Sequence, residues 1–147
     1  MSRKKQKIYL IDGNSLCYRA YYAIQNLSTS KGFPTGAIYG FLNMLKKLIK
    51  EYSPGMMAIV FDMKGPTTRH KKYEDYKIHR KPMPDELVEQ LPRIKELIDA
   101  YNIPICQKQG YEADDIIATL ALKARKKGMD VVIVTSDKDA LQLVDEK

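Results

Sequence analysis

The sequence lacks the segments that would insert a protein into a membrane or export it from the cell. No apolar run approaches the roughly 20 residues that a membrane-spanning helix needs. The basic N-terminus is followed by the apolar run 8–11, which is far too short for the core of a signal peptide. Only two cysteines, Cys17 and Cys106, are present, and their spacing matches neither a metal-binding nor a redox motif. We therefore expect reduced thiols and a cytoplasmic location.

The sequence also lacks the short motifs of several large enzyme classes. It contains no Walker A sequence, no GxGxxG, no GxSxG and no paired-histidine zinc motif. Its composition is that of an ordinary globular domain, with 44% hydrophobic and 29% charged residues in a chain of 147. The net charge of +7 and the isoelectric point of about 9.3 favour a polyanionic partner. Nucleic acid is the first candidate, ahead of an anionic membrane surface.

Apolar stretches typical of strands alternate with segments of helical periodicity. Strands are expected at residues 8–11, 57–61 and 131–135, with a weaker candidate at 103–106. Helices are expected at about 16–24, 38–52, 85–101 and 113–126, and residues 140–144 look like the start of another. Ser15 could cap the first helix, and Pro92 should kink or split the third. This order predicts an α/β fold with a mainly parallel sheet covered on both faces.

Each of the three strong strands leads into an aspartate. Parallel strands bring their carboxyl ends to one edge of the sheet, which is where open α/β sheets bind ligands. The acidic stretch before the fourth helix follows the weak strand and should lie at the same edge. The candidate metal ligands are Asp12, Asp62, Glu112, Asp114, Asp115, Asp137 and Asp139. Oxygen ligands suit Mg²⁺ or Mn²⁺, and such ions would offset the repulsion between the carboxylates.

Each acidic position also has a simpler structural interpretation. A single aspartate at a strand end is commonly a turn residue. Carboxylates in a first helical turn, such as Asp114 and Asp115, complement the helix dipole and satisfy its unpaired N–H groups. The metal hypothesis therefore depends on the convergence of several acids at one edge. There, two metal ions could generate hydroxide and stabilise the leaving oxygen of a phosphodiester.

Residues 63–83 have a different character, with seven positive and two negative side chains, a local net charge of +5, and no core pattern. If residues 69–80 are helical, cations and tyrosines share one face: Arg69, Tyr73, Tyr76 or Lys77, and Arg80. Rings that stack on bases and cations that follow phosphates are typical of single-strand binding. The alternative is a solvated charged loop. Phe33, in the loop 26–36, could wedge against a base pair or pack locally.

Five ordered motifs resemble the 5′→3′ exonuclease/flap endonuclease family, and most closely the N-terminal nuclease domain of bacterial DNA polymerase I and its stand-alone relatives. The similarity covers nearly the whole chain after residue 7. The motifs are residues 10–15 (LIDGNS) with 18–20 (YRA), residues 36–41 (GAIYGF), Phe61 and Asp62 with residues 69–70 (RH) and 76–80 (YKIHR), residues 110–115 (GYEADD), and residues 135–139 (TSDKD).

This resemblance implies a PIN-like α/β domain with a basic helical arch, and cleavage of DNA at 5′ flaps and nicks and of RNA primers. It implies that the seven acids listed above hold Mg²⁺ or Mn²⁺, two ions in the complete domain, with Asp115 among the catalytic residues. Lys77 and Arg80 would contact the scissile phosphate. The nucleic-acid contacts would come from Arg19, Arg69, Tyr73, Tyr76, Lys77 and Arg80. No membrane partner is expected, and a polymerase could be covalently linked in the full-length protein.

The family continues into a helix–hairpin–helix element and a further aspartate, which this chain does not contain. Residues 1–147 are therefore interpreted as the N-terminal part of a nuclease domain, with residues 63–83 as the arch. Two alternatives stay open. One is a catalytically incomplete nucleic-acid-binding fragment, and the other is a PIN-like ribonuclease.

Overall fold

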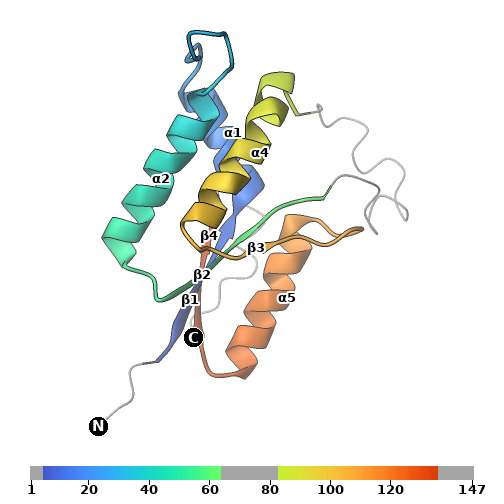
Figure 1. The fold of residues 1–147 in the computed structure, drawn as a ribbon. Coiled ribbons are helices and arrows are strands. Elements are labelled where there is room, and N and C mark those ends of the chain that lie inside the picture. Colours follow the sequence, from blue (N-terminus) through green and yellow to red (C-terminus); the bar gives the residue numbers. More distant parts are fainter. Residues whose placement is uncertain (1–4, 64–82, 136–147) are drawn as a thin grey trace.

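A four-stranded parallel sheet forms the centre of the computed structural model, which describes residues 5–63 and 83–135 (Figure 1). The strands are β1 (Lys7–Asp12), β2 (Met56–Val60), β3 (Ile105–Cys106) and β4 (Asp130–Val134), in the order β3-β2-β1-β4. In the register, Ile11 lies opposite Ile59 on one side and opposite Val134 on the other. The sheet has the parallel strands that the sequence predicts.

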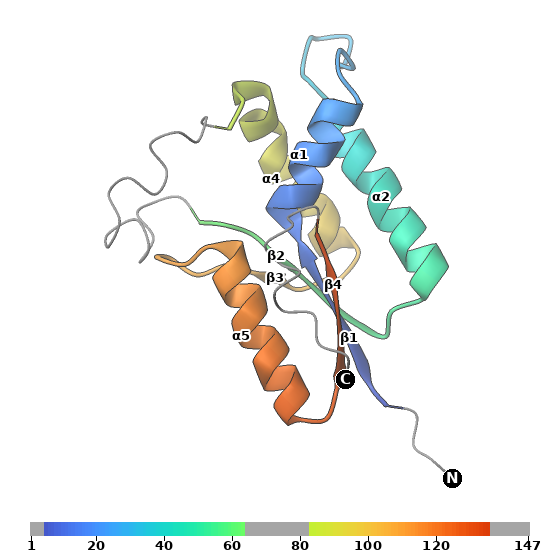
Figure 2. The ribbon, with the colours of Figure 1, turned by 180° about the vertical axis from the view of Figure 1, so that it is seen from behind.

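Helices cover the sheet on both faces. They are α1 (Gly13–Ala23), α2 (Gly36–Tyr52), α4 (Asp85–Ala100) and α5 (Ala113–Lys126). α1, α2 and α4 pack together on one face, and α5 lies on the other (Figures 1 and 2). The predicted α/β architecture is therefore confirmed for the part of the chain that the structure describes. No helix in that part is both long and apolar enough to cross a membrane.

Two hydrophobic cores explain why the strands are continuously apolar. Successive side chains of a strand point to opposite faces. Ile11 and Ile59 therefore join the core under α1, α2 and α4, whereas Leu10 and Val60 join the core under α5. Since both faces are covered, neither set of side chains can be polar.

Two glycines let α1 and the start of α2 approach closely. A Cβ on Gly36 would lie 2.2 Å from the backbone oxygen of Ile24, and one on Gly40 would lie 3.0 Å from the Cβ of Ala20. Gly40 and Ala20 are both buried, so this helix pair is in direct contact through small residues. The contact fixes the direction in which α1 leaves β1.

The helix boundaries correct two expectations. Ser15 is not the cap of the first helix, which begins earlier, at Gly13. Asp12 takes that role, because its side chain accepts the Ser15 N–H at 3.1 Å. The second concerns Pro92, where α4 is not split, because the helix runs as a single element across the proline. Buried residues on both sides of the proline, Leu87 and Ile94, pack into the same core and hold the helix together.

Candidate active site

The ends of three parallel strands and the start of α5 meet at one edge of the sheet (Figures 1 and 2). Asp12 is the last residue of β1, and Asp62 follows shortly after the end of β2. Glu112 precedes α5, the helix that follows β3. Asp114 and Asp115 lie in the first turn of that helix. The structure therefore places these five predicted ligands at one edge, as the spacing of strands and acids indicated.

Asp12 joins three elements at this edge. Its Oδ1 accepts the Ser15 N–H at the start of α1, and its Oδ2 accepts the hydroxyl of Thr135 at 3.2 Å, just after β4. Only 5% of Asp12 is exposed, and a buried carboxylate is tolerated when donors or cations compensate its charge. Its position is therefore set by the first helix and by the end of the neighbouring strand.

Asp62 connects the first turn of α1 to the start of α5. Its backbone N–H donates to the Oδ1 of Asn14 at 2.8 Å, and its own Oδ1 accepts the N–H of Ala113. These two bonds span 48 and 51 residues of sequence, so only the folded chain creates them. Nothing in the local sequence pattern indicates that Asn14 orients Asp62.

Glu112 and Asp115 form a reciprocal capping box at the start of α5. The Asp115 side chain accepts the Glu112 N–H at 3.4 Å, and the Glu112 side chain receives the backbone N–H of Asp115. Glu112 is 5% exposed, whereas Asp114 and Asp115 are half-buried. The capping role that the sequence suggested as an alternative is therefore present. It fixes the direction of the Glu112 and Asp115 carboxylates.

The described carboxylates have the donor chemistry that hard divalent cations prefer, since every candidate ligand atom is oxygen. Within residues 5–63 and 83–135, however, no three His, Cys, Asp or Glu side chains come together closely enough to hold a metal ion. Asp137 and Asp139 lie outside the described residues. The structure therefore brings five of the seven predicted ligands to one edge of the sheet, and the complete set of metal ligands stays a prediction.

Gly13 allows the chain to pass over the core at this edge. A Cβ on Gly13 would lie 2.7 Å from the ring atoms Cε1 and Cζ of Phe61, and 2.9 Å from the Cγ2 of Ile59. Both neighbours are fully buried, so the side chain that a larger residue would bring has no space. A glycine at this position is therefore needed for close packing beside Asp12.

Cys17 is a fully buried thiol on α1, the helix that begins at this edge. Burial raises the pKa of its thiol from 9.0 to about 12, with Lys95 opposing the shift and Asp12 adding to it. The thiol therefore stays protonated at neutral pH and is a poor nucleophile. The expectation of a reduced, structural cysteine agrees with this position, since Cys17 and Cys106 are both free thiols.

The predicted nucleic-acid contacts fall mostly outside the described residues. Those outside are Arg69, Tyr73, Tyr76, Lys77 and Arg80. Arg19 is described, and it is exposed on α1. Phe33 is 36% exposed, and its backbone N–H donates to the Thr29 hydroxyl at 3.1 Å, so both interpretations of this residue remain.

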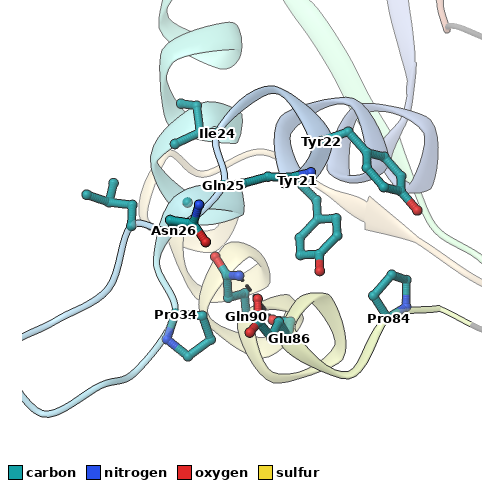
Figure 3. A pocket seen from close by; sticks show the side chains of 11 residues that line it. Tyr21, Tyr22, Ile24, Gln25, Asn26, Pro34, Pro84, Glu86 and Gln90 are labelled. Carbon is teal, nitrogen blue, oxygen red and sulfur yellow. Dashed lines mark hydrogen bonds between the residues drawn. The ribbon is translucent and has the colours of Figure 1, made fainter.

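A pocket of about 260 Å³ lies between the end of α1 and the starts of α2 and α4 (Figure 3). At its floor, the buried Gln90 accepts the Ile38 N–H at 3.1 Å and donates to the backbone oxygen of Glu86 at 3.0 Å. The rings of Tyr21 and Tyr22 meet edge to face at its side. Among the described residues no lysine or arginine lines this pocket, and Glu86 contributes a carboxylate, so the described lining does not suit a phosphate. No local pattern indicated Gln90, whose side-chain oxygen caps the first turn of α2, a helix distant in sequence.

Comparison with known sequences gives a consistent set of relatives. The sequence profile described as "5′-3′ exonuclease, N-terminal resolvase-like domain" matches residues 7–147. The chain is 52% identical over 139 residues to the 5′-3′ exonuclease of Aquifex aeolicus, covering 95% of this chain and 48% of that protein. It is 46% identical over 140 residues to DNA polymerase I of Caldicellulosiruptor bescii, covering 95% of this chain and 16% of the polymerase. The chain thus spans less than half of these relatives.

Solved structures share the fold. The flap endonuclease of bacteriophage T5, in a pseudo-enzyme–product complex with DNA and metal ions, matches with a TM-score of 0.76 and 20% identity. That match covers 97% of this chain and 53% of the T5 chain. The catalytic core of Rad2 in complex with DNA matches with a TM-score of 0.55 and 20% identity, over 95% of this chain and 40% of the other. The predicted PIN-like fold is confirmed by these matches.

Proposed function

This chain belongs to the family of 5′-3′ exonuclease N-terminal resolvase-like domains, and on that basis we propose that it hydrolyses phosphodiester bonds of DNA near 5′ ends. The observation that carries the proposal is the meeting of Asp12, Asp62 and the acidic start of α5 at one sheet edge. A basic chain with a net charge of +7 and an acidic edge has the charge distribution that this reaction needs. The positive surface binds the phosphate backbone, and the acids hold the cations that act on one phosphate.

The proposed cofactor is a divalent ion, Mg²⁺ or Mn²⁺. The residues that would hold it are Asp12, Asp62, Glu112, Asp114 and Asp115, together with Asp137 and Asp139. Bound there, such ions supply activated water and stabilise the leaving oxygen of an in-line displacement.

The chain's own contribution is the orientation of the carboxylates. The Ala113 N–H holds one oxygen of Asp62, so the other oxygen of that carboxylate is directed by the same contact. The capping box fixes Glu112 and Asp115 relative to the axis of α5. Preformed orientation of this kind lowers the reorganisation needed when the substrate binds.

The proposed substrates are DNA with 5′ flaps or nicks and RNA primers on duplex DNA. They follow from the family and from the predicted arch at residues 63–83, with Lys77 and Arg80 on the scissile phosphate. A covalently linked polymerase is the proposed partner in the full-length protein, because one relative is a DNA polymerase I of which this chain matches 16%.

The test compares cleavage of a labelled 5′-flap duplex, with Mg²⁺ or Mn²⁺, by the wild-type chain, Asp115→Ala and the control Asp99→Ala. Asp99 is an exposed carboxylate near the end of α4, so both variants lose one negative charge. We expect Asp115→Ala to lose at least the roughly 10- to 100-fold that removal of an outer partner of a metal site costs. Equal cleavage by all three proteins would contradict the proposal.

A second candidate, a non-catalytic nucleic-acid-binding fragment, is suggested by the net charge of +7. Titration with Mn²⁺ separates the two functions. A steep salt dependence of DNA binding without Mn²⁺ affinity supports the fragment, whereas saturable Mn²⁺ binding that Asp12→Ala weakens supports the nuclease. A preference for unstructured RNA over flap DNA would instead indicate a ribonuclease.

A further inference from the structure

The loop between β3 and α5 carries an aromatic side chain, Tyr111, and a cation, Lys108, which have no role in the proposed binding of metal ions. The Nζ of Lys108 lies 4.9 Å from the centroid of the Tyr111 ring. Tyr111 is 41% exposed although it directly precedes the buried Glu112. The loop follows the carboxyl end of β3, which puts it at the same sheet edge as Asp62 (Figure 1). A large ring exposed beside a candidate active site calls for a ligand or a partner.

Contacts at both ends hold this loop in place. At its start, the Lys95 ammonium donates to the Oε1 of Gln107 at 3.2 Å. At its end, the Ala113 N–H donates to the Asp62 carboxylate. The position of Tyr111 is therefore tied to the same residues that shape the acidic edge.

The turn inside the loop is also defined. The Tyr111 N–H donates to the backbone oxygen of Lys108 at 3.2 Å, which closes the turn. Gly110 has a φ of +86°, a conformation that side-chain-bearing residues rarely adopt. Because the backbone of this loop is fixed, little backbone freedom is lost when the ring and the ammonium bind a ligand.

The pair offers a π-face and a positive charge a few ångströms apart. A nucleotide presents a flat base and a phosphate in the same way, and single-strand binding proteins use stacking and cations together. Free phosphate would make no use of the ring, and an apolar peptide would make no use of the ammonium. The chemistry of the pair therefore fits an unpaired nucleotide better than either of those ligands.

We propose that Tyr111 and Lys108 form a nucleotide platform, with the Tyr111 ring stacking on an unpaired base next to the bond to be cut and the Lys108 ammonium contacting an adjacent phosphate. This inference rests on the proposed nuclease function, to which it adds two positioning residues.

The test uses the full chain and a 5′-flap duplex with 2-aminopurine at the unpaired position beside the junction, with Ca²⁺ as the divalent ion. The variants are Tyr111→Ala, Tyr111→Phe and Lys108→Ala. The controls are Tyr101→Ala and Lys126→Ala, which remove a 39% exposed ring and an exposed lysine near the C-terminal ends of α4 and α5. Affinity is measured over a range of salt concentrations, together with 2-aminopurine fluorescence, which falls when the base stacks.

The two residues have separable signatures. Tyr111→Ala should weaken binding about five- to hundred-fold and restore the fluorescence, with an unchanged salt slope. Tyr111→Phe should behave as wild type, because the ring is retained. Lys108→Ala should lower the salt slope by about one.

Both controls should match wild type. If Tyr111→Ala and Lys108→Ala also match the controls while wild type binds the flap, the platform is wrong and the nuclease proposal stands. If wild type shows no flap binding at all, both proposals fall.

Discussion

Gly13→Ala tests whether close packing at the end of β1 supports the acidic edge. The new Cβ would lie 2.7 Å from two ring atoms of Phe61 and 2.9 Å from the Cγ2 of Ile59, both fully buried residues. Overpacking of this kind costs about 1–3 kcal/mol. Replacing glycine by alanine inside a helix stabilises the helix by up to about 1 kcal/mol, and by less at its first position, which Gly13 occupies in α1. The net destabilisation should therefore be about 0.5–2 kcal/mol.

The assay is urea unfolding followed by circular dichroism, in a double-mutant cycle with Phe61→Leu. The smaller side chain removes the ring atoms that the new Cβ meets, so Gly13→Ala should cost less in that background, where only the contact with the Cγ2 of Ile59 remains. The expected coupling is about 1–2 kcal/mol, within the range measured for residues in contact. Gly55→Ala is the matched control, since a Cβ there would meet nothing within 4 Å.

Two results would refute this reasoning. One is a Gly13→Ala protein as stable as wild type with an unchanged dependence on urea concentration. The other is an equal cost in the wild-type and Phe61→Leu backgrounds, because the ring would then not be the cause. A loss of stability in Gly55→Ala comparable to that in Gly13→Ala would point instead to a general effect of replacing glycine.

Two further predictions concern buried polar and thiol groups. Gln90→Leu should destabilise the protein by about 1–3 kcal/mol in urea unfolding, because the Ile38 N–H loses its acceptor at the start of α2. The control is Gln109→Leu, at an exposed position. Equal stability of the two variants would rule out the capping role of Gln90. With its pKa near 12, Cys17 should resist alkylation by iodoacetamide at pH 8 in a Cys106→Ser protein, whereas Cys106 should react in a Cys17→Ser protein. The thiol keeps its proton in the folded protein at pH values above 9.0, the pKa that it has when exposed, so its contribution to stability should be lost as the pH rises from about 9 to about 12. Rapid labelling of folded Cys17 at pH 8 would contradict its burial.

Local sequence patterns predicted the elements that bury a regular face. The apolar runs of β1, β2 and β4 and the periodicity of α2 and α5 could be identified because side-chain direction repeats with period two in strands and 3.6 in helices. The weak candidate at 103–106 proved to be a strand of only two residues, β3. The start of α1 was misplaced, because Ser and Asp both cap helices and only the folded backbone distinguishes Asp12 from Ser15.

The arrangement of the candidate site depended on contacts between distant parts of the chain. The rule that parallel strands share an edge was enough to bring Asp12, Asp62 and the start of α5 together. It could not indicate that Asn14 accepts the backbone N–H of Asp62 and that Ala113 donates to the Asp62 carboxylate, because those partners are 48 and 51 residues away. The predicted roles of the arch and of Asp137 and Asp139 concern residues outside the described part of the chain and stay predictions.

By itself the sequence determined the fold class, the order of the elements and the edge where the acids collect. Those properties follow from periodicity and from the chirality of parallel connections, which are local rules that every α/β chain obeys. Only the tertiary structure decided how the edge is built. Gly13 is needed because Phe61 lies against it, and the loop with Lys108 and Tyr111 is held because Gln107 and Ala113 meet residues of other elements. Such contacts depend on distances across the fold, and no local pattern encodes them.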